Sequence, residues 1–538
     1  MNEWLDEQEW APYSPLLAFS ILFHLLLLWM LLQISLASTP EERPPSLSPK
    51  VTIYLGELGD QGDGIQEGEE AEEDQEEAEE HTEEESQQEE ETPVPTENPE
   101  EVVEESETTN EPSSSPETLL NASPALGVGP SQKLQQKFQS LLKKSIAPSQ
   151  TASASSNLKA DQAFAMRSKK GRADGVTRNG GSGATEDAVE LSLAWLAEHQ
   201  NLDGSWTPTT FNQGCECTGN GYDTYVPALT GLVLLCYSGA GYTHKTGPYR
   251  RQVSKGLDYL IQQSQQPNGR FAAKNMYNHA IAHLAMAEHY ALSKDPQLKR
   301  PLEKAVAFCL LSQQEGGGWS YSATPETQRN DSSITGFMLM ALITTHLSDV
   351  EVPSILFQKI ARRFSQMTDS DGTVLYADTG TNAGRTGMGL VAVGLYARLA
   401  LGLSPDSNLS KTQATRLLAQ LPDWQMANTL SNSMYYWYYG TLATFMMGPD
   451  TFRPWNKRLS KILVAKQRRS GHEKGSYDPV GKWGKHGGRL YATAINTLTL
   501  EIYYKYAPQY IAQLSQFKSF WEKEQKKKPW EREVFGRK

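Results

Sequence analysis

Cysteine is scarce in this chain, with four residues among 538. So few cysteines, widely spread, do not make a disulfide framework, and they leave the redox compartment open. Cys215 and Cys217 lie one residue apart in a glycine-rich stretch, where a strained local disulfide, half of a zinc site and two free thiols are all open interpretations. Cys236 and Cys309 lie in apolar runs and are expected to be buried thiols.

Lysine and arginine are absent from residues 57–118, which hold 27 of the 64 acidic residues. The rest of the chain therefore carries 37 acidic and 50 basic residues, so the net charge of −14 describes one segment. A tract of Glu, Gln, Ser, Thr and Pro with almost no aromatic residues cannot bury enough apolar surface to offset the loss of chain entropy. We interpret residues 57–130 as a disordered, self-repelling acidic tether, whose simplest role is to space and solvate.

One apolar run, Leu16–Leu36, is long enough to cross a bilayer. It is interrupted by Ser20, His24, Gln33 and Ser35, and its 21 residues reach about 31 Å at helical rise. We predict a transmembrane helix over residues 16–36, after a short tail over 1–15. A cleaved signal peptide is the alternative, because residues 36–38 resemble a cleavage site, but acidic residues stand where such peptides carry basic ones.

Ser20 and His24 are four residues apart, so they share one face of the predicted span. Ionisable groups inside a bilayer are costly and often functional; a neutral histidine satisfied by a backbone carbonyl is the alternative. This pair, the extended stretch Val51–Leu55 and the long tether resemble the anchor of TonB-type energy transducers. The resemblance implies inner-membrane motor proteins as partners and a periplasmic C-terminal domain, whereas the two basic residues after the span favour a cytoplasmic one by charge count.

Shorter segments separate these parts from the rest. Residues 37–56 form the juxtamembrane segment. Residues 131–147 carry apolar side chains at helical spacing with lysines beside them, which predicts either an amphipathic helix for a membrane surface or for the tether, or a marginal helix with no partner. Residues 148–184 are rich in Ser, Ala and Gly, typical of a flexible linker, and residues 509–538 form a basic tail. The chain has one short basic cluster and lacks a glycine-rich phosphate loop, so the sequence does not predict nucleic-acid binding.

An internal repeat fills residues 185–508. A short apolar helix, rich in small residues, recurs six times from a polar or aromatic start. The gaps between starts are 56, 52, 54, 51 and 53 residues, counted from Asp223, His279, Asp331, Arg385, Tyr436 and Arg489. A second kind of helix alternates with it, charged on one face and often followed by Gln, Gly and an aromatic residue, as at Gln200, Gly204 and Trp206.

The two kinds of helix differ in expected burial. A helix charged on one face is exposed there, whereas one that is apolar nearly all round, such as the segments containing Ala280–Met286 and Gly389–Leu395, is buried on most sides. Six of each in alternation close into a double ring, with six parallel inner helices inside six outer ones. We therefore predict an all-α (α/α)6 toroid, with almost no strand.

The Gln-Gly-aromatic elements resemble the Q-x-G-x-W repeats of the terpene cyclase and protein prenyltransferase superfamily, an (α/α)6 toroid. The stretches Met434–Thr441 and Gly475–Pro479 resemble bacterial prenyltransferase/squalene-oxidase-repeat proteins that join a transmembrane anchor and a low-complexity tether to this ring. The thioester domain of complement and alpha-2-macroglobulin shares the ring. The resemblance implies an enzyme that acts on an isoprenoid or another hydrophobic substrate.

The catalytic signatures of these families are missing. Asp369-Ser370-Asp371-Gly372 lacks the last acid of the Asp-x-Asp-Asp run that protonates an alkene in terpene cyclases. No Asp-x-Cys precedes an inner helix, as the zinc site of prenyltransferases requires. Gly214-Cys215-Glu216-Cys217 has no Gln to close a thioester. Whether the chain is an enzyme is therefore left open.

In a toroid all inner helices start at one end, so their N-termini surround a common mouth. This places eight candidates for a ligand pocket together: Asp223, Asn278, His279, Asp331, Arg385, Tyr436, Arg489 and Tyr491. Arg385 and Arg489 suit an anionic group, while Asp223 and Asp331 have helix capping as their alternative. His279 and His283 share a helix face at metal-ligand spacing and, with Cys215 and Cys217, are weak metal candidates beside the alternative of buried histidines.

We expect a membrane-anchored, non-catalytic module of the cell envelope that binds a protein, glycan or lipid ligand at the mouth, with no cofactor. The alternatives are a membrane-tethered enzyme on a hydrophobic substrate and a TonB-like transducer. A wide, dry central cavity with an acid near its wall favours the enzyme, whereas a filled centre favours the binding module.

Overall fold

The computed structural model describes residues 163–265, 269–272, 275–323, 329–380, 382–506, 511 and 514–518. The predicted tail, span, tether and amphipathic helix therefore lie outside the described residues. Among the helices that are described, none combines the length and the apolar character needed to cross a bilayer. The span over residues 16–36 was not among those helices and stays a prediction.

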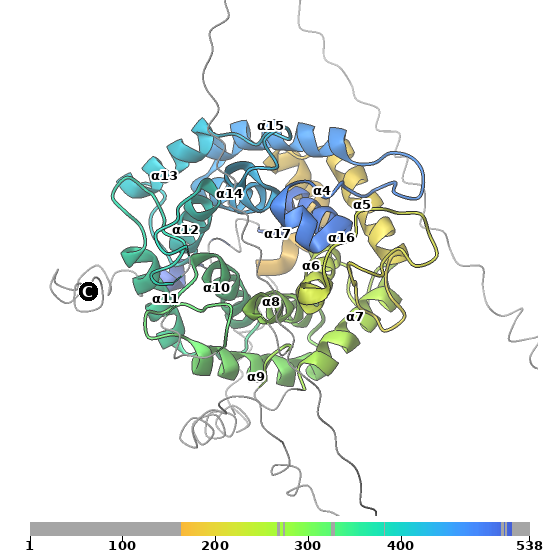
Figure 1. Cartoon of the computed structure of the whole chain (residues 1–538), viewed down its shortest axis with the longest axis horizontal. Coiled ribbons are helices and arrows are strands. Elements are labelled where there is room, and N and C mark those ends of the chain that lie inside the picture. Colours follow the sequence, from red (N-terminus) through yellow and green to blue (C-terminus); the bar gives the residue numbers. More distant parts are fainter. Residues whose placement is uncertain are drawn as a thin grey trace, which may run out of the picture. The chain divides into compact units, whose positions relative to one another are not determined.

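The described residues fold into two concentric layers of helices (Figure 1). The outer layer consists of α5 (Gly183–Glu198), α7 (Arg250–Gln263), α9 (Pro296–Ser312), α11 (Ser354–Gln366), α13 (Asn408–Ala419) and α15 (Pro449–Lys466). The inner layer consists of α6 (Val226–Gly239), α8 (Met276–Ser293), α10 (Ser332–Leu347), α12 (Met388–Ala400), α14 (Met434–Met447) and α16 (Gly481–Leu500).

Each inner helix packs against the next, and α16 packs against α6, so the inner layer closes on itself. In the outer layer, the last helix, α15, contacts the first, α5. The described residues contain isolated β-bridges but no strand. The predicted all-helical toroid is confirmed, and repeats one and six meet at a seam formed by α5, α6, α15 and α16.

Burial follows the predicted division. In α10 every residue except His346 is buried, whereas α11 buries one face, through residues such as Leu356, Ile360 and Phe364. A helix with one apolar face covers a core, and a helix apolar on all sides lies inside one. The pattern of charge along the sequence therefore assigns each helix to its layer.

The glutamine of the repeat joins neighbouring outer helices. Gln313, after α9, donates from Nε2 to the carbonyl oxygens of Gly317 in its own turn (3.0 Å) and Leu356 in α11 (3.2 Å). Gln200 does the same toward α7, at Gly204 and Gln252. Gln467 closes the ring, since its Nε2 donates to the carbonyl oxygens of Gly475 and of Ala188 in α5.

Glycine and the aromatic residue complete the element. Gly317 has φ +93° and lies so close to the carbonyl oxygen of Lys359 that a Cβ would overlap it. The next aromatic residue, Trp319, is fully buried, and its backbone N–H donates to Thr335 Oγ1 on the inner helix (3.2 Å). The turn therefore ties an outer helix to its inner partner and to the next outer helix.

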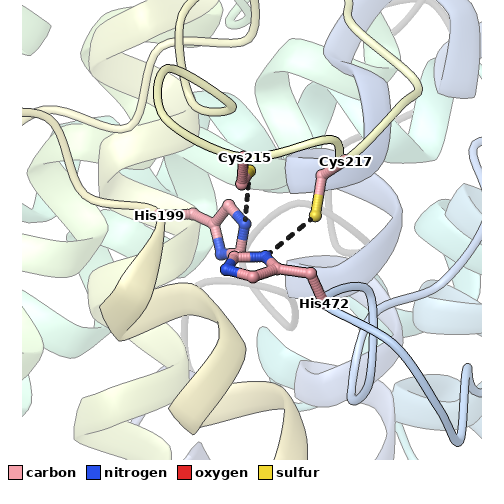
Figure 2. A group of neighbouring side chains, drawn as sticks. All are labelled: His199, Cys215, Cys217 and His472. Carbon is pink, nitrogen blue, oxygen red and sulfur yellow. Dashed lines mark hydrogen bonds between the residues drawn. The ribbon is translucent and has the colours of Figure 1, made fainter.

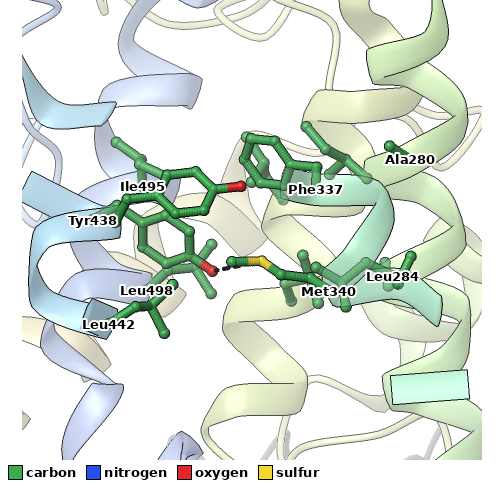
Figure 3. Packing of buried hydrophobic residues seen from close by; sticks show 14 of the residues in the cluster. Ala280, Leu284, Phe337, Met340, Tyr438, Leu442, Ile495 and Leu498 are labelled. Carbon is green, nitrogen blue, oxygen red and sulfur yellow. Dashed lines mark hydrogen bonds between the residues drawn. The ribbon is translucent and has the colours of Figure 1, made fainter. Parts of the chain in front are cut away.

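The centre of the ring is filled with side chains (Figure 3). Tyr438 on α14 reaches Met340 on α10, two helices away around the inner layer, with its hydroxyl 3.9 Å from the methionine sulfur. Leu284 on α8 and Leu498 on α16 are buried in the same cluster. This close packing leaves the middle of the toroid as a hydrophobic core.

A short N-terminal extension covers the end of the ring where the inner helices finish. It comprises η2 (Ala165–Arg167) and α4 (Lys169–Asn179), which pack against α17 (Ile502–Lys505). The Arg167 guanidinium lies 2.8 Å and the Lys505 ammonium 3.0 Å from the same oxygen of the fully buried Glu288. Burial disfavours the charged carboxylate, but the two cations outweigh it and lower the pKa of Glu288 to about 2.

Candidate functional site at the mouth of the ring

A pocket opens at the opposite end, where the inner helices begin. Its walls come from the first two turns of five inner helices, from residues just before them, and from α16 on both sides of its kink at Gly488. The cavity has a volume of about 140 Å³. A dry apolar cavity of about 150 Å³ is known to hold benzene, whereas pockets for drug-sized ligands are about 300–1,000 Å³. In this structure the pocket therefore admits a ring or the end of a chain.

Aromatic side chains dominate the pocket. Tyr277, Phe337 and Tyr435 lie on one side, and Trp483 and Tyr491 come from α16. Burial raises the pKa of Tyr277, Tyr435 and Tyr491, so these phenols are neutral at pH 7. Among the described residues that line the pocket, none is Asp or Glu. The wall is apolar, with neutral hydroxyl groups at a few points.

Arg385 supplies a cation at the mouth. Its guanidinium carbon lies 4.1 Å from the centre of the Tyr376 ring, a stacked arrangement that leaves the N–H groups at the edge of the guanidinium for a ligand. Thr386 and Gly387, just before α12, and Gly389, in its first turn, also line the pocket. No side chain caps this helix, so its first N–H groups face the mouth together with Arg385.

A carboxylate lies one layer behind this wall. Asp331 is fully buried and accepts hydrogen bonds from the backbone N–H groups of Ser333 and Ile334 (2.9 and 3.1 Å) and from the Ser333 hydroxyl. The Ser333 oxygen in turn lies 2.5 Å from the Tyr277 hydroxyl. Since Ser333 gives its hydrogen to Asp331, Tyr277 donates to Ser333, and a relay of hydrogen bonds joins the pocket to a buried acid.

Of the eight residues predicted to share the mouth, Arg385 and Tyr491 line the pocket. Asp331 caps α10. Asp223 is exposed, accepts a hydrogen bond from Thr209 (2.6 Å) and caps no helix through its side chain. Asn278 is buried and bridges two inner helices, since its Oδ1 accepts from the N–H of Ala228 and its Nδ2 donates to the carbonyl of Thr224.

His279, Tyr436 and Arg489 point away from the pocket. His279 Nδ1 accepts the backbone N–H of Phe271 (3.2 Å), the same part that Thr335 plays for Trp319. The Tyr436 hydroxyl donates to the carbonyl of Gln420 (2.6 Å) behind α14. Arg489 is buried at the seam, where it pairs with Glu473 (3.0 Å) and Asp478 (2.9 Å).

The metal candidates divide into two clusters. His279, His283 and Cys309 lie together, fully buried. Burial lowers the pKa of His283 to about 3, so its imidazole is neutral, and His283 Nε2 already lies 2.9 Å from Thr345 Oγ1. These three side chains lie inside the packed core of the ring. Cys215 and Cys217 lie at the seam with two histidines that the sequence did not single out, His199 and His472.

Sequence reasoning also missed most of the pocket wall. Tyr277, Tyr435 and His486 each stand within a few residues of a predicted helix start. The signal for them was the start itself, because the first turn of each inner helix forms the rim. Tyr376 precedes α12 by a longer stretch and reaches the pocket through its contact with Arg385.

The sequence matches no family model and no curated protein. Among solved structures, it is similar to the type II terpene cyclase MstE from Scytonema, with 13% identity and a TM-score of 0.42 over 61% of this chain and 98% of that one. It is also similar to the GH76A alpha-1,6-mannanase from Salegentibacter sp. HEL1_6, with 10% identity and a TM-score of 0.42 over 62% and 98%. At these values the similarities transfer neither activity nor residue roles to this chain.

Proposed function

We propose that the toroid is a non-catalytic binding module of the cell envelope, held at a membrane by residues 16–36 and exposed to the periplasm. Its ligand carries an apolar or aromatic group next to an anionic one. The observation that carries this proposal is the pairing of a filled ring centre with a small aromatic pocket at the mouth, edged by Arg385.

The chemistry of the pocket selects the ligand. An apolar wall favours a ring or an alkyl end, because burying apolar surface contributes roughly 25 cal/mol per Å². Arg385 and the uncapped start of α12 favour a carboxylate, phosphate or sulfonate beside it. A fatty acid, a lipid headgroup with its first methylenes and a peptide C-terminus after an aromatic residue all carry this combination.

An enzyme acting on a hydrophobic substrate is the second candidate, and one observation favours it. The relay from Tyr277 through Ser333 to Asp331 connects the pocket with a buried acid. The Asp369–Asp371 turn gives no support, since Asp371 is exposed and pairs with Arg416 (3.0 Å) on the outer surface. Conversion of a polyprenyl substrate by the parent protein, followed by mass spectrometry, and loss of that conversion in the Tyr277→Phe variant would establish this alternative.

The binding proposal is tested with residues 128–538, which form one compact unit, and with anilinonaphthalene sulfonate, a fluorescent probe that is both aromatic and anionic. Gly389 lines the pocket, and a Cβ there would lie 3.4 Å from the Tyr435 ring, an ordinary contact. Gly389→Leu therefore fills the cavity without a backbone clash. We expect probe fluorescence with the parent protein and its loss in this variant.

Two matched ligands test the anionic part. Dodecanoate and dodecanol share their chain, so Arg385 distinguishes them by charge. We expect dodecanoate to displace the probe at about tenfold lower concentration, since a charge-assisted hydrogen bond contributes about 1.5–3 kcal/mol. Arg385→Gln should remove that preference, whereas Arg416→Gln on the outer surface should retain it. Equal displacement by both ligands, or equal probe binding in Gly389→Leu, contradicts the proposal.

A further inference from the structure

Four side chains with metal-binding atoms converge at the seam of the ring (Figure 2). They are His199, at the end of α5, Cys215 and Cys217, in the loop before α6, and His472, in the loop after α15. Their ligand atoms all lie within 4.8 Å of one another. Both cysteines are free thiols in this structure. We propose that these residues form a structural zinc site that fastens the first repeat to the sixth.

The distances fit a tetrahedron of zinc ligands. Zinc lies about 2.3 Å from sulfur and about 2.0–2.1 Å from nitrogen, which puts neighbouring ligands about 3.3–3.8 Å apart. Cys217 Sγ lies 3.3 Å from His472 Nδ1, and Cys215 Sγ lies 3.6 Å from His199 Nε2. Both pairs have the separation of an edge of that tetrahedron, and the other pairs of ligand atoms lie within 4.8 Å, so side-chain shifts of about 1 Å or less would bring all four to zinc-ligand distances.

One histidine is already held in the form that binds metal. His199 Nδ1 lies 2.6 Å from the carbonyl oxygen of Trp195, to which it donates its proton. Its Nε2 is therefore the bare nitrogen, and this is the atom that faces Cys215. The ring also stacks on Trp195, with 4.0 Å between centroids. Such second contacts fix the orientation of metal-binding histidines.

The two loops are held side by side by contacts outside the cluster. Glu473 accepts hydrogen bonds from the backbone and side chain of Thr218 (3.1 and 3.0 Å). Arg489 pairs with Glu473 and donates from Nε to the carbonyl of Thr218 (2.7 Å). Residues adjoining Cys217 and His472 are thus fixed to each other, which places the ligands in position before the ion arrives.

The donor set decides the metal and its role. Two sulfur and two nitrogen ligands in a tetrahedral arrangement are typical of zinc. Two thiolates and two neutral imidazoles also balance the charge of Zn²⁺, which suits a site where His199 and Cys217 are buried. All four positions are filled by protein, so no position is open for a substrate, as in structural zinc sites.

At this location the ion would have a structural role that does not depend on which ligand binds at the mouth. Cys217 and His472 are 255 residues apart in the sequence, so the ion joins two ends of the repeat array that only ring closure brings together. The bound loop also reaches the mouth, because Tyr222 donates its N–H to the carbonyl of His486 (2.8 Å), a pocket residue. Zinc should therefore stabilise the seam and this part of the wall.

The experiment uses the full chain and measures bound zinc, thiol reactivity and thermal stability. We expect stoichiometric zinc in the purified protein, and a cobalt-substituted form with the visible bands of tetrahedral Co²⁺ and a thiolate charge-transfer band. A chelator should lower the melting temperature, expose two thiols to alkylation and speed hydrogen exchange in residues 207–222 and 468–478. Added zinc should reverse all three effects.

Variants separate this site from general loss of stability. Cys217→Ser and His472→Gln should each lower zinc affinity by at least about 100-fold, since loss of even a supporting contact costs about 10–100-fold. Cys236→Ala, which removes one buried thiol between α6 and α16, should keep stoichiometric zinc. Absence of zinc, a Cys215–Cys217 disulfide, an octahedral cobalt spectrum, or equal zinc binding in the ligand variants overturns the proposal. The zinc content of the purified parent protein tests the proposal even if a variant does not fold.

Discussion

His289 provides a direct test of how burial in the inner layer controls stability. The side chain on α8 is fully buried, and its Nε2–H donates to the carbonyl of Leu234 on α6 (3.0 Å). Burial lowers its pKa from 6.5 to about 4, an effect that the nearby His244 and Lys505 increase and Glu288 opposes. The imidazole is therefore neutral in the folded protein over a range where it is charged in the unfolded chain.

The sign and size of the effect follow from linkage. The unfolded chain binds more protons between pH 6.5 and 4, so the free energy of unfolding falls as the pH falls through this range. A shift from 6.5 to about 4 corresponds to about 3 kcal/mol at 1.36 kcal/mol per unit. With these two pKa values, about 2 kcal/mol of it is lost between pH 7 and pH 5.

His289→Gln removes the titration and keeps a donor for the Leu234 carbonyl. Urea unfolding of residues 128–538, followed by circular dichroism, should show the parent losing about 2 kcal/mol more than the variant between pH 7 and pH 5. The other buried histidines contribute equally to both proteins and cancel in the difference. Parallel pH profiles for the parent and the variant would refute the reasoning.

Two further substitutions test the packing of the ring. Glu288→Gln should lower the free energy of unfolding at pH 7 by about 3 kcal/mol, because Arg167 lowers the pKa of the Glu288 carboxyl in the folded protein. This stabilisation is fully present above pH 4.5 and is lost as the pH falls towards 2. A urea midpoint at neutral pH that matches the parent would contradict the prediction. Gly317→Ala should cost more than about 2 kcal/mol, since it combines a positive φ with overlap at the Lys359 carbonyl. The control Gly183→Ala, which meets nothing within 4 Å, should leave the melting temperature nearly unchanged.

The ring could be predicted from the sequence because the burial of each helix determines a pattern of apolar and charged residues that repeats along the chain. Inner helices such as α10 are buried all round and must be apolar on every face, while α11 shows charge on its outer face. The glutamine and glycine recur for a physical reason, as Gln313 and Gly317 make the contacts that join one outer helix to the next. Each of these constraints acts locally and repeats along the chain.

The pocket was harder to predict, because successive residues of a helix point about 100° apart. Tyr435 and Tyr436 are neighbours at the start of α14, yet Tyr435 lines the pocket and Tyr436 bonds to Gln420 behind the helix. A repeat of about 53 residues locates the start of each helix but not its rotation. Arg489 was assigned to the mouth for this reason, although it lies at the seam.

The proposed zinc site illustrates a different limit. Cys215 and Cys217 stand close together in the sequence and are visible as a pair, and His199 precedes Cys215 by 16 residues, but His472 becomes their neighbour only when the ring closes. The contact between Cys217 and His472 spans 255 residues. A short sequence motif therefore cannot predict that these two residues lie together.

The N-terminal extension and the pocket lie at opposite ends of the ring. Arg167 pairs with Glu288 in the second half of α8, whereas the pocket lies at the beginning of that helix. The 18 residues of α8 span about 27 Å. A force applied to the N-terminal extension would act first on the ion pairs of Glu288 with Arg167 and Lys505, at the opposite end of α8 from the pocket.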